Sequence, residues 1–220
     1  MSKTVLSFGL TPGDIAMGCG GSLTLLTDQG WNAVNIFCAY SGENLNALAK
    51  EARMAAKILG VGDVAFLLID PGAQMFGREA MMRAAKLIRK HRPDVIFTFS
   101  AQDPTPDRAG LSSCVRAGIE AAASPTTEGL DGEPCCVLTA FGFEIAPPLA
   151  RYDHAVNISE TMNRKMEAID CYETLIGRKV DEAMQGLARY RGRMSDAGEY
   201  AEVFDIMYGE HDPFHEWRDG

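Results

Sequence analysis

The sequence predicts a single three-layer αβα domain, with a mostly parallel β-sheet between two layers of helices and a helical C-terminal extension. Two observations support this prediction. Apolar segments and segments of helical periodicity alternate at least four times along the chain. The apolar segments are hydrophobic throughout rather than at every second position, as is typical of strands buried on both faces. We expect the sheet core in residues 1–145 and the helical extension and tail in residues 146–220.

The elements follow one another in a regular order. Five short apolar runs are predicted strands: 5–9, 33–39, 64–69, 94–99 and 136–143. The predicted helices cover 22–29, 45–59, 79–90, 114–123, 159–176 and 181–191. Gly30 and Gly60 stand where the first two helices end, as glycine often does at a helix C-terminus. The residues after 191 are expected to form a looser tail.

Composition narrows the class of protein. The formal net charge of the 220-residue chain is −9, so phosphate backbones and anionic membranes are unsuitable partners. No apolar run is long enough to cross a membrane, and the first ten residues have no signal-peptide pattern. The six cysteines form no C-x-x-C pair, which favours free thiols in a reducing compartment. We therefore expect a cytoplasmic protein.

Two loops are expected to carry the chemistry. Ligands of open parallel sheets bind at the carboxyl ends of the strands, and residues 10–21 and 100–110 each follow a predicted strand there. The first loop contains Asp14 and the run Gly18-Cys19-Gly20-Gly21. We expect these glycines to allow close packing of the following helix on the sheet rather than to hold a phosphate, because the full G-x-G-x-x-G spacing is missing.

Motifs in these loops and beyond them resemble those of the LmbE/PIG-L zinc N-deacetylases. The matching runs are Thr11-Pro-Gly-Asp-Ile15, Gly18-Cys-Gly-Gly-Ser-Leu23, Leu59-Gly-Val61, Arg92-Pro-Asp-Val-Ile96, Thr105-Pro-Asp-Arg108 and Tyr200-Ala-Glu-Val-Phe204. Their order and spacing cover about residues 4–208. The resemblance implies a Rossmann-like fold and a zinc-dependent amide hydrolase as the family's activity.

The resemblance also assigns roles to positions. It places the three zinc ligands at Thr11, Asp14 and Arg108, the general base at Gly13 and the helper of the oxyanion at Thr105. Hydrolytic zinc needs three protein ligands, and an arginine is never deprotonated to become one. Of the three positions, only Asp14 has a side chain suited to zinc. We therefore expect no cofactor, with Thr11, Asp14 and Arg108 as vestigial metal positions.

The same substitutions predict an ion pair. A carboxylate that loses a neighbouring cation is left buried and uncompensated, which costs several kcal/mol. We therefore expect Arg108 to occupy the vacated metal position and to pair with Asp14 or with Asp107. Asp14 and Asp107 are the candidate catalytic residues, and each can instead serve as a helix N-terminal carboxylate.

The remaining candidates are ligand-binding positions. The expected set is Thr11, Gly13, Glu43, Asp70, Asp103, Thr105, Arg108 and His154. Glu43 and Asp70 follow strands and match polar positions of the resembled family, while Asp103 can equally be a turn residue. If zinc is bound after all, the missing ligands are expected from His154 or from the histidines of the tail.

Three functions stay open at this point. The chain is expected to bind a small polar or anionic ligand without zinc, as a pseudoenzyme or as the partner of an active paralogue. One alternative is altered chemistry, since a branch of the resembled family hydrates an unsaturated tricarboxylate in aromatic-acid degradation. The other is an N-deacetylase with displaced metal ligands. Homo-oligomers are common in the family, and we expect one here.

Overall fold

The computed structural model describes residues 2–40, 45–69, 77–172, 179–209 and 213–214. Its centre is one sheet of seven strands in the order β3-β2-β1-β4-β5-β7-β6. The strands are β1 (Thr4–Gly9), β2 (Asn32–Tyr40), β3 (Asp63–Ile69), β4 (Val95–Phe99), β5 (Thr139–Phe143), β6 (His154–Asn157) and β7 (Ala201–Gly209). The pairs among β1 to β5 are parallel, and β7 runs antiparallel between β5 and β6.

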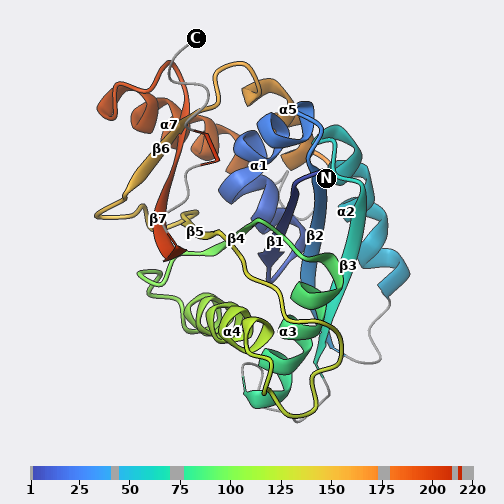
Figure 1. The fold of residues 1–220 in the computed structure, drawn as a ribbon. Coiled ribbons are helices and arrows are strands. Elements are labelled where there is room, and N and C mark those ends of the chain that lie inside the picture. The colour runs from blue at the N-terminus through green and yellow to red at the C-terminus, as the bar shows by residue number, and fades with distance from the viewer. Residues whose placement is uncertain (1, 41–44, 70–76, 173–178, 210–212, 215–220) are drawn as a thin grey trace.

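Helices cover both faces of this sheet (Figure 1). They are α1 (Pro12–Asp28), α2 (Leu45–Ile58), α3 (Arg78–His91), α4 (Pro106–Ala123), α5 (Met162–Ile169) and α7 (Val180–Met194). Helices α1, α2 and α5 lie on one face and α3 and α4 on the other, while α7 packs beside β7. The predicted α/β fold with a mostly parallel sheet is confirmed, and the structure adds an antiparallel strand to it.

Among the expected elements that differ from the structure, the helix expected over 159–176 ends at Ile169. Three further differences bear on the site. Helix α1 starts at Pro12 rather than at residue 22, so the glycine run lies inside the helix. Helix α4 likewise starts eight residues before its predicted start, because Thr105 and Pro106 supply an N-cap and a first helical residue. Residues 201–209 were expected in a loose tail but form β7, which is buried between β5 and β6 over its first half.

Helix α1 is broken at Cys19, whose φ of −142° and ψ of 17° are not helical. In an unbroken helix the Gly21 N–H would donate to the Met17 carbonyl. Here Glu202 of β7 accepts the N–H groups of Gly21 and Ser22, at 2.9 and 2.7 Å. Lys165 of α5 donates to the Met17 carbonyl at 2.6 Å.

Lys165 and Glu202 also bind each other. Their Nζ–Oε1 distance is 2.6 Å, and each side chain is only 3% exposed. The pair thus supplies partners for three backbone groups at the break in α1, the N–H groups of Gly21 and Ser22 and the Met17 carbonyl. Because a buried charge is costly without a counter-charge, each partner keeps the other in place.

Glycines bring α1 close to its neighbours. A Cβ atom at Gly18 would lie 2.2 Å from Cδ2 of Phe143 on β5, and one at Gly21 would lie 2.8 Å from Ile158. Van der Waals contact between carbons needs about 3.5–4.0 Å, so no side chain fits at either position. The prediction that the glycine run serves close packing is confirmed for these two residues.

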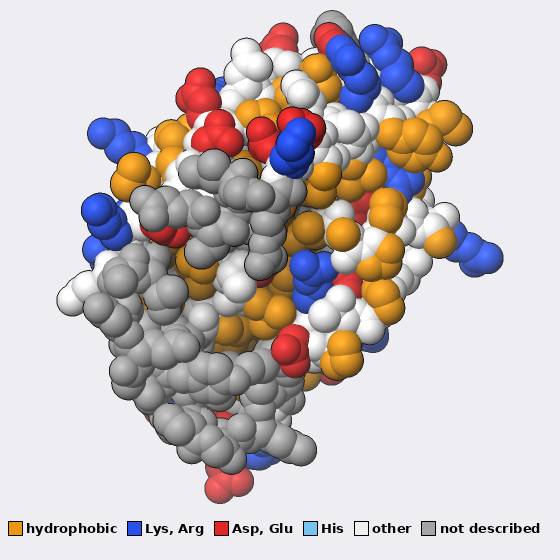
Figure 2. Space-filling view, turned by 180° about the vertical axis from the view of Figure 1, so that it is seen from behind, with side chains coloured by type: hydrophobic (Ala, Val, Ile, Leu, Met, Phe, Trp, Pro, Cys, Tyr) orange, Lys and Arg blue, Asp and Glu red, His pale blue; other side chains and the backbone are white. Residues whose placement is uncertain are grey.

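Acidic and basic side chains are interspersed over much of the described face in Figure 2, and several Lys and Arg side chains lie near one another at its upper right. None of the described helices is long and apolar enough to span a bilayer. All six cysteines are free thiols, as expected, and Cys19, Cys114 and Cys135 are buried.

Gly18→Ala is expected to lower the free energy of unfolding by about 1–3 kcal/mol, because the added methyl group would overlap the Phe143 ring. Gly186→Ala in α7 is the matched control, since a Cβ there meets no atom within 4 Å. It should raise stability by about 0.5–1 kcal/mol through helix propensity. Urea denaturation of both variants checks this pair, and equal effects would contradict the packing role of Gly18.

Glu202→Gln is expected to cost about 3–5 kcal/mol, because it leaves the Lys165 ammonium buried without a carboxylate. Adding Lys165→Met should recover part of that loss in the same denaturation assay. Glu199→Gln, which breaks an exposed ion pair with Arg189, is the control and should change little. If Glu202→Gln lowers the free energy of unfolding as little as the control does, the Lys165–Glu202 pair does not stabilise the break in α1.

Candidate functional site

Asp14 lies at the carboxyl edge of the sheet, in the first turn of α1. Its side chain is buried, and Oδ2 accepts the backbone N–H of Thr11 at 2.6 Å. Burial raises the pKa of Asp14, while the hydrogen bond from Thr11 and the attraction of Arg108 act in the opposite direction. The interpretation of Asp14 as a helix N-terminal carboxylate is therefore confirmed.

The other residues of the first loop have backbone roles. Thr11 is the exposed N-cap residue of α1, and its carbonyl accepts the N–H of Asp14 at 3.1 Å. Gly13 is buried in the first turn of the helix, where it has no side chain to take up a proton. Of this loop, Asp14 alone brings an ionisable group to the sheet edge.

Two thiols and a phenol lie near Asp14, and sequence reasoning did not select them. Burial raises the pKa of Cys38 at the end of β2 to about 12, and the charges of Cys114 and Asp14 add to the effect. Burial likewise raises the pKa of Cys114 on α4 to about 11. Tyr172 is buried too, and its pKa is raised by burial and, less strongly, by Cys171, Glu51 and Asp14. These groups keep their protons at neutral pH.

Cys38 could have been selected from the sequence as a site residue, because it lies near the carboxyl end of a strand that pairs with β1. Tyr172 follows α5 and offered no such signal.

Arg108 is oriented differently from the prediction. Its Nη1 donates to Oδ2 of Asp103 at 3.3 Å and to the Ala146 carbonyl at 2.8 Å. The guanidinium lies over the ring of Phe99, 5.2 Å from the centroid. The expected ion pair with Asp14 or Asp107 was wrong: the guanidinium pairs with Asp103, whose side chain is 3% exposed. Arg108 still acts on Asp14 over a longer distance, through the electrostatic effect on its pKa.

The rest of the second loop forms the start of α4. Oδ1 of Asp103 accepts the backbone N–H of Thr105 at 2.8 Å, which is the turn role considered for it. Thr105 is the N-cap residue of α4, and Asp107 is exposed in its first turn. Asp107 therefore complements the helix dipole and lies outside the buried part of the site.

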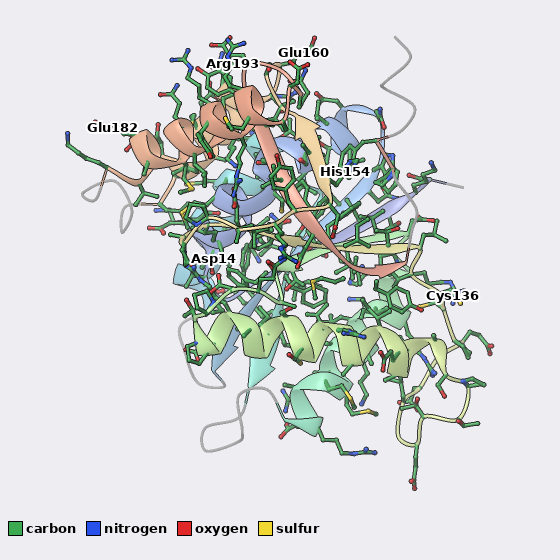
Figure 3. The ribbon with its side chains drawn as sticks, turned by 90° about the vertical axis from the view of Figure 1, so that its left-hand side faces the viewer. Asp14, Cys136, His154, Glu160, Glu182 and Arg193 are labelled. Carbon is green, nitrogen blue, oxygen red and sulfur yellow. The ribbon has the colours of Figure 1, made fainter. Side chains whose placement is uncertain are left out.

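His154 does not belong to this site. Its ring packs against those of Phe141 and Phe214, with centroid distances of 5.8 and 5.7 Å, and these two rings also contact each other. Figure 3 shows His154 and Asp14 well apart. His154 lies on the edge strand β6, which β5 and β7 separate from β4, so it is remote from Asp14. Its role as a ligand-binding residue stays a prediction. Glu43, Asp70, His211 and His215 lie outside the described residues.

The described residues at Thr11, Asp14 and Arg108 do not form a set of ligands that fits a zinc ion. Within the described ranges, no group of three His, Cys, Asp or Glu side chains is arranged to hold a metal. Thr11 is an exposed N-cap, and Arg108 donates its hydrogen bonds to Asp103 and Ala146. The nearby thiols Cys38 and Cys114 do not form, with Asp14, a group arranged to hold a metal.

A second buried ion pair lies at the same edge and was missed from the sequence. Glu144 follows β5 directly, and Arg191 of α7 binds it through Nε at 2.8 Å and Nη2 at 2.6 Å. Arg191 also donates to the Leu149 carbonyl at 2.7 Å. Because the two residues are far apart in sequence and on different elements, no spacing rule links them.

Beside this pair, Asp205 of β7 accepts a hydrogen bond from Ser100 Oγ at 2.8 Å. Burial raises the pKa of Asp205, and the hydrogen bond from Ser100 acts in the opposite direction. Together with Asp103 and Glu144, Asp205 gives this edge of the sheet three buried carboxyl groups.

Comparison with known proteins gives one consistent family. The model of the GlcNAc-PI de-N-acetylase (PIG-L) family matches residues 12–119. A diacetylchitobiose deacetylase of Thermococcus kodakarensis is 28% identical over 232 residues, which span 94% of this chain and 84% of the relative.

Solved structures agree in fold. A conserved protein of Thermus thermophilus superposes with a TM-score of 0.84 at 26% identity, covering 96% of this chain and 97% of the other. A 4-carboxy-2-hydroxymuconate hydratase of Pseudomonas putida superposes with a TM-score of 0.75 at 20% identity, covering 96% of this chain and 98% of its own. By its motifs, its fold and these relatives, the chain belongs to the LmbE/PIG-L family of deacetylase-like proteins.

Proposed function

We propose that this chain is a metal-free member of its family, which binds a small polar ligand at the carboxyl edge of the sheet without a zinc-activated water. The observation that carries the proposal is the state of Arg108. It stands at a position of a family zinc ligand, and its guanidinium is bound to Asp103 and to the Ala146 carbonyl. A guanidinium keeps its proton in proteins and cannot become a ligand.

The chemistry around Asp14 supports the same proposal. A zinc hydrolase needs a base to accept the proton of the attacking water, and the matching position is Gly13. Oδ2 of Asp14 accepts the N–H of Thr11 at 2.6 Å, so this carboxyl group serves the start of α1. A role as a ligand-binding pseudoenzyme or as the partner of a zinc-bearing paralogue needs neither the base nor the metal.

The charges near Arg108 favour a polar ligand over a strongly anionic one. Asp103 pairs with the guanidinium and takes part of its hydrogen-bonding capacity, and the charge of Asp14 is close enough to interact with it. Asp107 adds a third carboxylate in the same turn of α4. An anion would therefore meet more like charge than opposite charge at this edge.

The protein purified from zinc-supplemented cells is expected to hold only substoichiometric zinc by plasma mass spectrometry, and Asp14→Ala should leave that content unchanged. The double variant Thr11→His, Arg108→His should gain zinc, because it restores two imidazole ligands beside Asp14. The wild-type protein should release no amine from diacetylchitobiose, the substrate named for its Thermococcus relative. Stoichiometric zinc in the wild type that is lost with Asp14→Ala would mean a deacetylase with displaced ligands.

A further inference from the structure

A cavity of about 220 Å³ lies at the carboxyl ends of β4 and β5, next to the Asp103–Arg108 pair. It opens between the loop after β4 and the loop after β5. One side of its wall is polar and consists of Ser100, Gln102, Asp103 and Glu144. The other side is apolar and consists of Phe143, Leu149, Ala150 and three prolines. Pockets for drug-sized ligands measure roughly 300–1,000 Å³, so this one has room for a single small ring.

The polar wall offers mainly hydrogen-bond acceptors. Asp103 accepts one hydrogen bond at each carboxylate oxygen, from Thr105 and from Arg108, and a carboxylate oxygen has room for about two. Oε1 of Glu144 likewise accepts one bond, from Arg191. Both acids therefore keep accepting capacity.

Donors are fewer on the same wall. The Ser100 hydroxyl gives its proton to Asp205 at 2.8 Å. The side-chain amide of Gln102 donates to the Arg151 carbonyl at 3.3 Å and to Oδ2 of Asp205 at 3.4 Å. Both distances are long for hydrogen bonds. A ligand that supplies N–H or O–H groups thus matches the wall better than one that only accepts.

The arginines of the two ion pairs lie behind the carboxylates and do not line the cavity. Arg108 lies over Phe99 at 5.2 Å and Arg191 over Tyr152 at 5.2 Å, so ring contacts and hydrogen bonds hold both guanidiniums in place. An anionic ligand would face two carboxylates with no cation among the lining side chains. An ammonium group would face the same carboxylates with favourable sign.

The apolar wall of the cavity is rigid. Prolines have a fixed φ and lose little entropy when a ligand binds beside them. Phe143, another residue of this wall, also packs closely against Gly18 of α1. Phe143 therefore contacts both the cavity and α1, the helix that bears Asp14.

We propose that this cavity binds a small primary amine, with the ammonium group on Asp103 and Glu144 and an apolar ring against Phe143 and the prolines. The inference rests on the proposed function, since it names the ligand class for the same edge of the sheet. It needs no metal, and the zinc content of the protein is measured separately from it.

The test uses three probes that share one ring: cyclohexylamine, cyclohexanol and cyclohexanecarboxylate. Each is titrated into the ¹⁵N-labelled full-length protein at neutral pH, where the amine is protonated. We expect cyclohexylamine to shift the side-chain amide of Gln102 and the backbone N–H of Leu149 in a saturable way. Cyclohexanol should bind more weakly, and the carboxylate should cause no saturable shift.

Two variants and a control locate the binding. Asp103→Asn should weaken the amine about tenfold, because a charge-assisted hydrogen bond is lost. Ala150→Leu should weaken it as well, since the larger side chain fills the cavity without removing an acceptor. Glu120→Gln, on the exposed surface of α4, should leave the affinity unchanged. The proposal is overturned if the carboxylate binds as tightly as the amine, if neither cavity variant weakens the amine, or if no probe shifts these signals.

Discussion

The structure depends on the break in α1 and on the buried pair that stabilises it. At the break, Glu202 accepts the Gly21 N–H at 2.9 Å and Lys165 donates to the Met17 carbonyl at 2.6 Å. These two residues come from β7 and α5, so the break joins three elements that are distant in sequence. The turn that bears Asp14 is thereby fixed relative to both the sheet and α5.

The same constraint explains why the C-terminal part belongs to the sheet. Glu202 reaches the break only because β7 lies between β5 and β6. Gly18 and Gly21 allow this approach, since a Cβ at either position would overlap Phe143 or Ile158. A helix with larger residues at these positions would stand too far from the strands for Glu202 to reach its backbone.

The parallel strands and their helices were predictable because each depends on local pattern, as in the apolar runs of β1 and β4. Strand β7 was not predicted, because Glu202 and Asp205 interrupt its apolar pattern. The side-chain partners that the described residues give them lie more than thirty positions away. Asp14 and Asp103 were found because they follow strand ends. The ion-pair partner of Arg108 could not be predicted from the sequence, because Asp103, Asp107 and Asp14 are all near it in sequence or in space. The folded loop brings Asp103 to the guanidinium.

Arg108 stands at the position of a family zinc ligand and its guanidinium is held by Asp103, and we propose that no zinc binds beside Asp14. The most direct measurement is anomalous diffraction at the zinc absorption edge from crystals grown with excess zinc. We expect no anomalous peak near Asp14, with Arg108 bound to Asp103 and to the Ala146 carbonyl. A peak within coordination distance of Asp14, with Arg108 displaced from Asp103, would contradict it.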